Sequence, residues 1–136
     1  MPPRFVDTNI FLRYLTRDDE QKAEQALALL RRVERGEEKI ATSVMVIFET
    51  VFTLQHSYGV AREQTRQLLS DILSLRGLRV PGKSVLLRAL DLYSNTNISF
   101  ADAYNAAFME ASAVSEIYSW DTDFDKLPGI TRLEPS

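Results

Sequence analysis

The chain has 136 residues, 45% of them hydrophobic, which is typical of one globular domain that can bury a core. Its net charge of −3 at pH 7 excludes a uniformly basic nucleic-acid-binding surface, although a local cationic patch is compatible with it. The absence of cysteine and of long apolar runs excludes a disulfide-rich secreted domain and a membrane-spanning protein, and the start of the chain does not resemble a signal peptide, so we expect a cytoplasmic protein.

In the first part of the chain, short strand-like segments alternate with longer helical ones. Apolar runs bounded by turn residues predict strands, and apolar residues at helical spacing predict helices. The expected elements are a strand at residues 4–6, helices at residues 10–15 and 18–35, a strand at residues 39–42 and a helix at residues 44–54. We expect Gly36 to end the second helix and Ser43 to cap the third, which is apolar on nearly every side and carries one charge, Glu49.

The rest of the chain continues this alternation. The expected elements are a helix at residues 62–75, a strand at residues 78–80, helices at residues 85–93 and 99–113, and strands at residues 116–120 and 130–133. We expect Gly77 to end the first of these helices. Strands separated by helices indicate a three-layer α/β/α fold around a parallel sheet, here of four to five strands. Because no linker is evident, we expect a single domain over residues 1–136.

Four carboxylates lie at the ends of apolar segments or inside them, namely those of Asp7, Glu49, Asp102 and Asp121. A carboxylate in apolar surroundings is costly unless it is paired or bound to a metal ion. Asp7 and Asp121 follow predicted strands, where open α/β sheets place their ligands, and the other two acids lie on helices. Because the chain has no cysteine and one histidine, the sequence favours a carboxylate site for Mg²⁺ or Mn²⁺ over a zinc site or a protein nucleophile.

Each acid also has a structural explanation. Asp7 can cap the helix that follows it, and Asp102 stands three residues after Ser99, as in a capping box. Glu49 is a good helix former and can point outward from a partly exposed face. The chemical interpretation therefore depends on the four acids acting together.

Three acids near the end of the chain have the alternate spacing that begins a calcium-binding loop: Asp121, Asp123 and Asp125. Such a loop needs a glycine at the position of Lys126 and a bidentate glutamate at the position of Arg132. The sequence therefore excludes an EF-hand, and the role of these acids has to be sought elsewhere.

Four segments in order resemble the PIN domain, and the match covers essentially the whole chain. They are Phe5-Val6-Asp7-Thr8-Asn9, the helix that carries Glu49, Phe100-Ala101-Asp102-Ala103, and Tyr118-Ser119-Trp120-Asp121-Thr122-Asp123-Phe124. Within this family, residues 7–15 and the short length are most similar to the VapC-type toxins of bacterial and archaeal toxin–antitoxin systems.

The resemblance implies an endoribonuclease that needs Mg²⁺ or Mn²⁺. The residues that match its catalytic, metal-binding acids are Asp7, Glu49, Asp102 and Asp121. Asp123 matches a further metal-binding acid, and Asn9 and Ser119 match polar positions of the same pocket. The resemblance also implies an RNA substrate, a cognate antitoxin protein and a homodimer.

Substrate affinity would then come from basic residues at the rim of the site. The candidates for phosphate contacts are Arg13, Arg17, Arg62, Arg66 and Lys83. Two alternatives to a toxin stay open at this point. One is a housekeeping RNA-processing nuclease of the same family, and the other is a non-catalytic module that binds RNA or protein.

Overall fold

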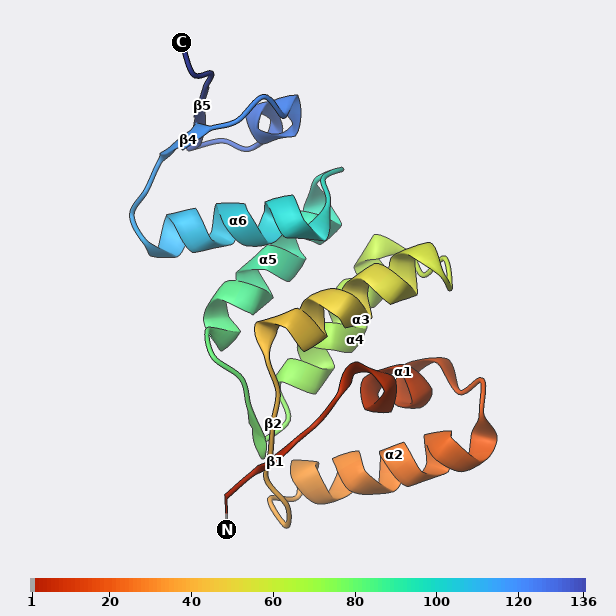
Figure 1. Cartoon of the computed structure of the whole chain (residues 1–136). Helices are drawn as coiled ribbons and strands as arrows, with labels where there is room; N and C mark the ends of the chain where they lie inside the picture. The colour runs from red at the N-terminus through yellow and green to blue at the C-terminus, as the bar shows by residue number, and fades with distance from the viewer. Residues whose placement is uncertain (1) are drawn as a thin grey trace. The chain divides into compact units, whose positions relative to one another are not determined.

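The predicted alternation of strands and helices is present in the structure, a computed structural model that describes residues 2–136. The chain divides into two units, one that ends at Lys83 and one that covers Ser84–Ser136, and each is described by itself. Figure 1 labels the helices and strands of both. Each unit contains parallel strands, as the α/β class predicts. None of the helices within residues 2–136 is long and apolar enough to cross a membrane.

A parallel sheet forms one part of the first unit. Its strands, in spatial order, are β1 (Arg4–Phe5), β2 (Ile40–Ala41) and β3 (Leu78–Arg79). The backbone N–H of Val6 donates to the carbonyl oxygen of Ala41 at 2.9 Å, and the hydroxyl of Thr42 donates to the carbonyl oxygen of Val6 at 2.9 Å. These bonds hold the chain immediately before Asp7 against the neighbouring strand.

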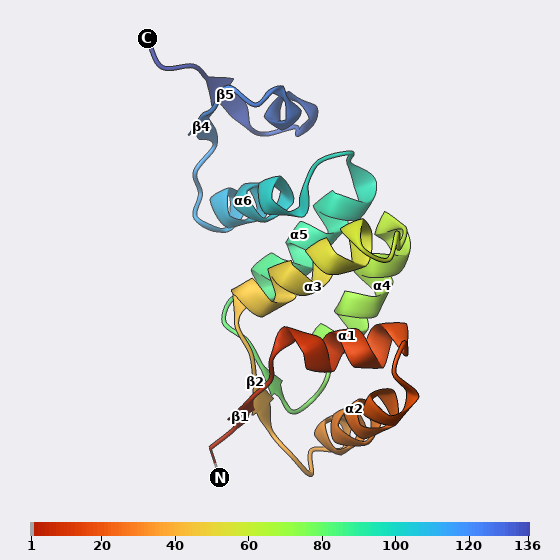
Figure 2. The same ribbon diagram turned by 45° about the vertical axis from the view of Figure 1, so that its right-hand side comes forward.

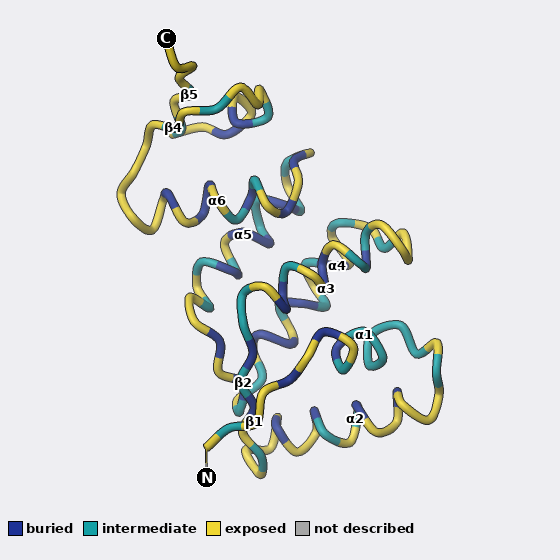
Figure 3. The backbone as a smooth tube through the Cα atoms, viewed as in Figure 1, coloured by how far each residue is buried: buried dark blue, intermediate teal, exposed yellow. Residues whose placement is uncertain are grey.

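Four helices complete the first unit: α1 (Thr8–Thr16), α2 (Glu20–Glu34), α3 (Val44–His56) and α4 (Arg62–Leu73). Helices α1 and α2 run antiparallel, α1 also packs against α3, and α3 packs against α4 (Figure 2). Buried positions recur along one side of α2, as the tube in Figure 3 shows, because its apolar residues have helical spacing. Phe11, Ile47 and Leu69 are fully buried in this part of the core.

Local signals explain where these helices begin and end. Gly36, with φ of +78°, follows the last residues of α2, and the Ser43 hydroxyl accepts a hydrogen bond from the Val46 N–H at 3.2 Å, so both predictions are confirmed. Helix α4 ends at Leu73, earlier than predicted, because the next N–H groups leave the α-helical pattern: that of Leu75 bonds to the carbonyl oxygen of Ile72, three residues back, at 3.0 Å.

The second unit contains the remaining elements, and the first of them, α5 (Lys83–Asn95), begins at the last residue of the first unit. The others are α6 (Phe100–Ala111), β4 (Glu116–Tyr118), the 3₁₀ helix η1 (Thr122–Lys126) and β5 (Thr131–Leu133). Strands β4 and β5 are parallel, and η1 packs against α6 and buries Phe124. The rings of Tyr93 and Phe100 meet edge to face at 5.8 Å. The described strands form one sheet of three strands and another of two strands. A single sheet of four to five strands therefore stays a prediction.

Gly77 has a different role from the predicted one. It lies just before β3, where a Cβ atom would be 2.5 Å from the carbonyl oxygen of Glu38 and 2.9 Å from that of Val33. Gly77→Ala should therefore destabilise the protein by about 1–3 kcal/mol, since the backbone has to move. The measurement is urea unfolding.

Gly59→Ala is the matched control for this substitution. Gly59 has φ of +62°, and a Cβ atom added there would meet no atom within 4 Å beyond its chain neighbours, so only backbone strain of about 1–2 kcal/mol is expected. Gly77→Ala should displace the backbone at β3 as well as lower the stability of the protein. Wild-type stability of Gly77→Ala would contradict the close-approach explanation.

Candidate metal centre

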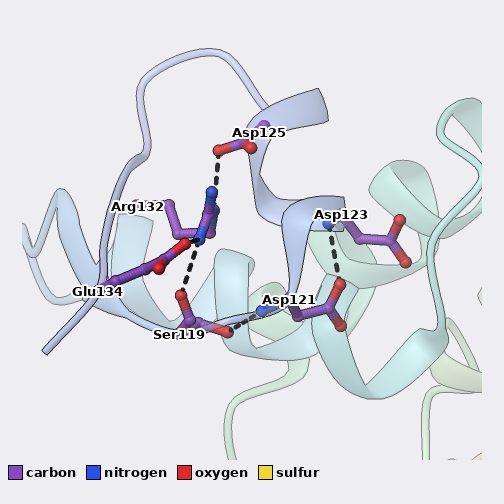
Figure 4. Close-up of polar contacts among 6 residues, drawn as sticks. All are labelled: Ser119, Asp121, Asp123, Asp125, Arg132 and Glu134. Carbon is purple, nitrogen blue, oxygen red and sulfur yellow. Dashed lines mark hydrogen bonds and ion pairs between the residues drawn. The ribbon is translucent and has the colours of Figure 1, made fainter.

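Three of the predicted acids lie together in the second unit. A carboxylate oxygen from each of Asp102, Asp121 and Asp123 lies within 4.8 Å of the other two. Metal–oxygen bonds of about 2.1 Å place two ligand oxygens on opposite sides of a bound Mg²⁺ about 4.2 Å apart. Small side-chain rotations would therefore allow the three carboxylate oxygens to bind one ion. Figure 4 shows Asp121 and Asp123 side by side at the start of η1.

Helix α6 positions Asp102. The Ser99 hydroxyl caps the helix by accepting a hydrogen bond from the Asp102 N–H at 3.1 Å, as the capping-box spacing predicts. Asp102 therefore lies in the first turn of α6, where the positive end of the helix dipole favours a carboxylate. The same cap fixes the backbone that carries this acid.

The turn after β4 positions the other two acids. The Asp121 N–H donates to the Ser119 hydroxyl at 3.0 Å, and the Asp121 carboxylate caps η1 by accepting from the Asp123 N–H at 2.9 Å (Figure 4). Because η1 begins directly at this cap, Asp121 and Asp123 are held close together in space. Ser119, predicted as a polar position of the pocket, thus supports the backbone of Asp121.

The acidic cluster is electrostatically unfavourable without a cation. Partial burial raises the pKa of Asp102 above its ordinary value, and the hydrogen bond and negative charge of Asp121 raise it further. The charge of Asp123 acts in the same direction, while a hydrogen bond from Ser99 opposes it. A divalent cation would remove this repulsion, and three carboxylate oxygens are ligands that suit Mg²⁺ and Mn²⁺.

Two basic residues flank the cluster, and the contacts that they make there were not predicted from the sequence. The Lys126 ammonium pairs with Asp123 at 2.9 Å and donates to the carbonyl oxygen of Asn97 at 3.1 Å. Arg132 pairs with Asp125 at 3.1 Å. Asp125 is therefore engaged by a guanidinium, in agreement with the exclusion of a calcium-binding loop.

Asp7 and Glu49 form a second acidic group, in the first unit. Asp7 caps α1 by accepting from the Thr8 N–H at 2.8 Å, and the Thr8 hydroxyl donates to Glu49 at 2.9 Å. Thr8 is buried, and sequence reasoning missed its role, although a hydroxyl residue directly after a predicted capping acid was a signal. The structure thus links the two acids through Thr8.

The expectation of apolar surroundings is wrong for most of the acids. Asp7, Glu49 and Asp121 are exposed, and Asp102 is half-buried. On α3, the buried side comprises residues such as Ile47 and Val51, whereas Glu49 lies on the exposed side. The physical reason to expect a cation is therefore the combination at Asp102 of partial burial with the repulsion of Asp121 and Asp123.

Most of the predicted phosphate contacts have partners within the protein. Arg13 pairs with Asp18, Arg17 with Glu20 and Glu24, Arg66 with Glu63, and Lys83 donates to the carbonyl oxygen of Leu78. Arg62 is the first residue of α4. Asn9 is exposed and lines a groove of about 460 Å³ together with Arg13 and Lys22. RNA contacts by these residues stay predictions.

Comparison with known proteins identifies the family. The PIN domain model matches residues 4–130. A VapC ribonuclease of Aquifex aeolicus (strain VF5) is 27% identical over 132 residues, which make up 97% of this chain and 96% of the relative. The chain therefore belongs to the PIN domain family, and the resemblance seen in its sequence is confirmed.

The crowding of acids predicts the effect of Asp102→Asn on the metal-free protein. The pKa of Asp102 is raised in the folded state, so the folded protein binds a proton more readily than the unfolded chain. Its contribution to stability therefore decreases as the pH rises from the ordinary carboxyl range through the raised pKa, and stays low above it. Asp102→Asn should remove this decline and stabilise the protein at pH 7 by up to about 1 kcal/mol.

Urea unfolding at several pH values in EDTA measures this effect. Asp71→Asn is the control, because Asp71 is an exposed acid of α4 outside both acidic groups, and it should keep the wild-type pH dependence. A less stable Asp102→Asn variant with an unchanged pH dependence would show that Asp102 is not under electrostatic strain.

Proposed function

We propose that this member of the PIN domain family is an endoribonuclease that hydrolyses RNA phosphodiester bonds with Mg²⁺ or Mn²⁺, as the toxin of a VapBC-type toxin–antitoxin pair in the cytoplasm. The observation that carries the proposal is the cluster formed by Asp102, Asp121 and Asp123. The VapC ribonuclease of Aquifex aeolicus, similar over nearly its whole length, supports an RNA substrate.

The proposed catalytic centre includes all of the acids predicted from the sequence. Asp7 and Glu49 would complete the metal site with Asp102 and Asp121, and Asp123 would be a further ligand. Asp7 follows β1, and Asp121 follows β4 after a short turn, so both stand beyond the carboxyl ends of parallel strands. Ligand sites of α/β proteins are built at such strand ends, which favours a ligand-binding role for each of these two acids.

The bound cation would polarise a phosphate oxygen and activate a water molecule as the nucleophile. The acids of the chain would hold and orient it, with Ser99 and Ser119 fixing the backbones of Asp102 and Asp121. Lys126 already neutralises part of the charge on Asp123, which lowers the repulsion that an approaching phosphate would meet. The chain itself supplies binding, orientation and charge compensation.

The proposal includes two protein partners. A second copy of the chain would form a homodimer, and a cognate antitoxin would silence the nuclease. An arginine or lysine of the antitoxin would enter the acidic site, where its positive charge replaces that of the metal ion. Apolar antitoxin residues would fill the groove of the proposed active site.

The first test is RNA cleavage by purified protein. Wild type should cleave single-stranded or loop RNA in Mg²⁺ or Mn²⁺ and lose this activity in EDTA. Asp7→Asn and Asp102→Asn should each reduce cleavage to background without loss of fold, because each removes a metal-binding charge. Gel analysis of labelled RNA and circular dichroism provide the two measurements.

Asp71→Asn serves as the control in this assay as well, since it removes an exposed acid outside the proposed site. It should cleave RNA like the wild type. Full activity of a nuclease-free preparation in EDTA would rule out the metal mechanism. Full activity of Asp7→Asn would restrict the site to the acids of the second unit.

The second test addresses the toxin role. Expression of the wild type alone should slow bacterial growth, and co-expression with the protein encoded by a neighbouring short gene should restore it. Asp7→Asn should be harmless without a partner, because it lacks nuclease activity. Growth curves at matched expression levels measure both effects.

The outcomes distinguish the remaining alternatives. Equal toxicity of wild type and Asp7→Asn would show that toxicity does not come from the nuclease site. RNA cleavage without toxicity would favour the RNA-processing nuclease. Binding of RNA or protein without cleavage in any metal would favour the non-catalytic module.

A further inference from the structure

Arg132 of β5 connects three segments around the acidic cluster. Its guanidinium donates to Asp125 at 3.1 Å, to the carbonyl oxygen of Ser119 at 3.0 Å and to Glu134 at 2.8 Å (Figure 4). The Arg132 side chain is only 14% exposed, whereas those of Asp125 and Glu134 are 54% and 57% exposed. The guanidinium is therefore held within the second unit instead of extending into solvent.

These bonds fix both ends of the segment that carries two of the cluster acids. Ser119 directly follows β4 and stands two residues before Asp121, and Asp125 follows Asp123 within η1. One planar guanidinium contacts both ends, so the distance across the segment is set by a rigid group. A lysine has a single nitrogen and cannot reproduce this fork of hydrogen bonds.

The charge of Arg132 would by itself act against a metal ion, because a positive charge near the cluster opposes the approach of a cation. A purely electrostatic role thus predicts tighter metal binding when Arg132 is removed. A role in positioning the acids predicts weaker binding. The two roles have effects of opposite sign, which allows a direct test.

We propose that Arg132 is a positioning residue of the metal centre, and that it keeps Asp121 and Asp123 close together by joining the end of β4 to η1. This inference rests on the proposed metal-dependent function. Arg132 would not contact the metal ion or the RNA. It would act through Ser119 and Asp125, as outer residues around metal sites do when they orient ligands.

Calorimetric titration with Mn²⁺ tests the inference on the full chain, with melting temperatures in EDTA recorded in parallel. Arg132→Met should weaken Mn²⁺ binding roughly tenfold to a hundredfold. The double variant Arg132→Met/Asp125→Asn keeps the net charge of the wild type and should show a similar loss. Arg88→Met, which removes the ion pair between α5 and Glu110 of α6, should leave Mn²⁺ affinity unchanged.

Arg132→Lys tests the guanidinium fork even if the Met variants do not fold, because it retains the charge and the aliphatic stem. It should bind Mn²⁺ several-fold more weakly than the wild type. Wild-type affinity of Arg132→Lys, or of the charge-neutral double variant, would overturn the positioning role and leave the metal centre intact. Absence of Mn²⁺ binding by the wild type would overturn the metal centre and this inference together.

Discussion

Repulsion between carboxylates is the constraint on which the candidate centre depends. The fold holds oxygens of Asp102, Asp121 and Asp123 within 4.8 Å, and this proximity contributes to the raised pKa of Asp102. The N-terminus of α6 and the ammonium of Lys126 compensate part of the charge. A divalent cation that binds only the folded protein would stabilise it further through linkage, so metal binding and stability are coupled in the proposed function.

Capping is the local device that places the key acids, which reconciles the structural and chemical explanations of each one. Asp7 caps α1 and Asp121 caps η1, each through its Oδ1 atom. A carboxylate has a second oxygen, so a cap bond and metal coordination are compatible. The cap also restricts rotation of the side chain, which lowers the entropy that would be lost on binding a cation.

Local features were predictable from the sequence because they depend on neighbouring residues. Ser43 and Ser99 begin helices and Gly36 ends one, as predicted, and the order of the acids identified the family. Contacts between distant residues were not predictable. The bonds of Thr8 to Glu49 and of Arg132 to Ser119 arise only after packing. The exposure of Glu49 was misjudged because Met45 and Phe52, the apolar residues on its side of α3, are themselves exposed.

The proposed function assigns Asp7 and Glu49 to the same metal ion as the cluster of Asp102, Asp121 and Asp123. Paramagnetic broadening of amide NMR signals by Mn²⁺ tests this claim most directly, because the effect depends on proximity to the bound ion. We predict that the signals of Thr8 and Asp123 lose intensity together at the same substoichiometric Mn²⁺ concentration. Broadening of Asp123 while Thr8 stays sharp would contradict a shared centre.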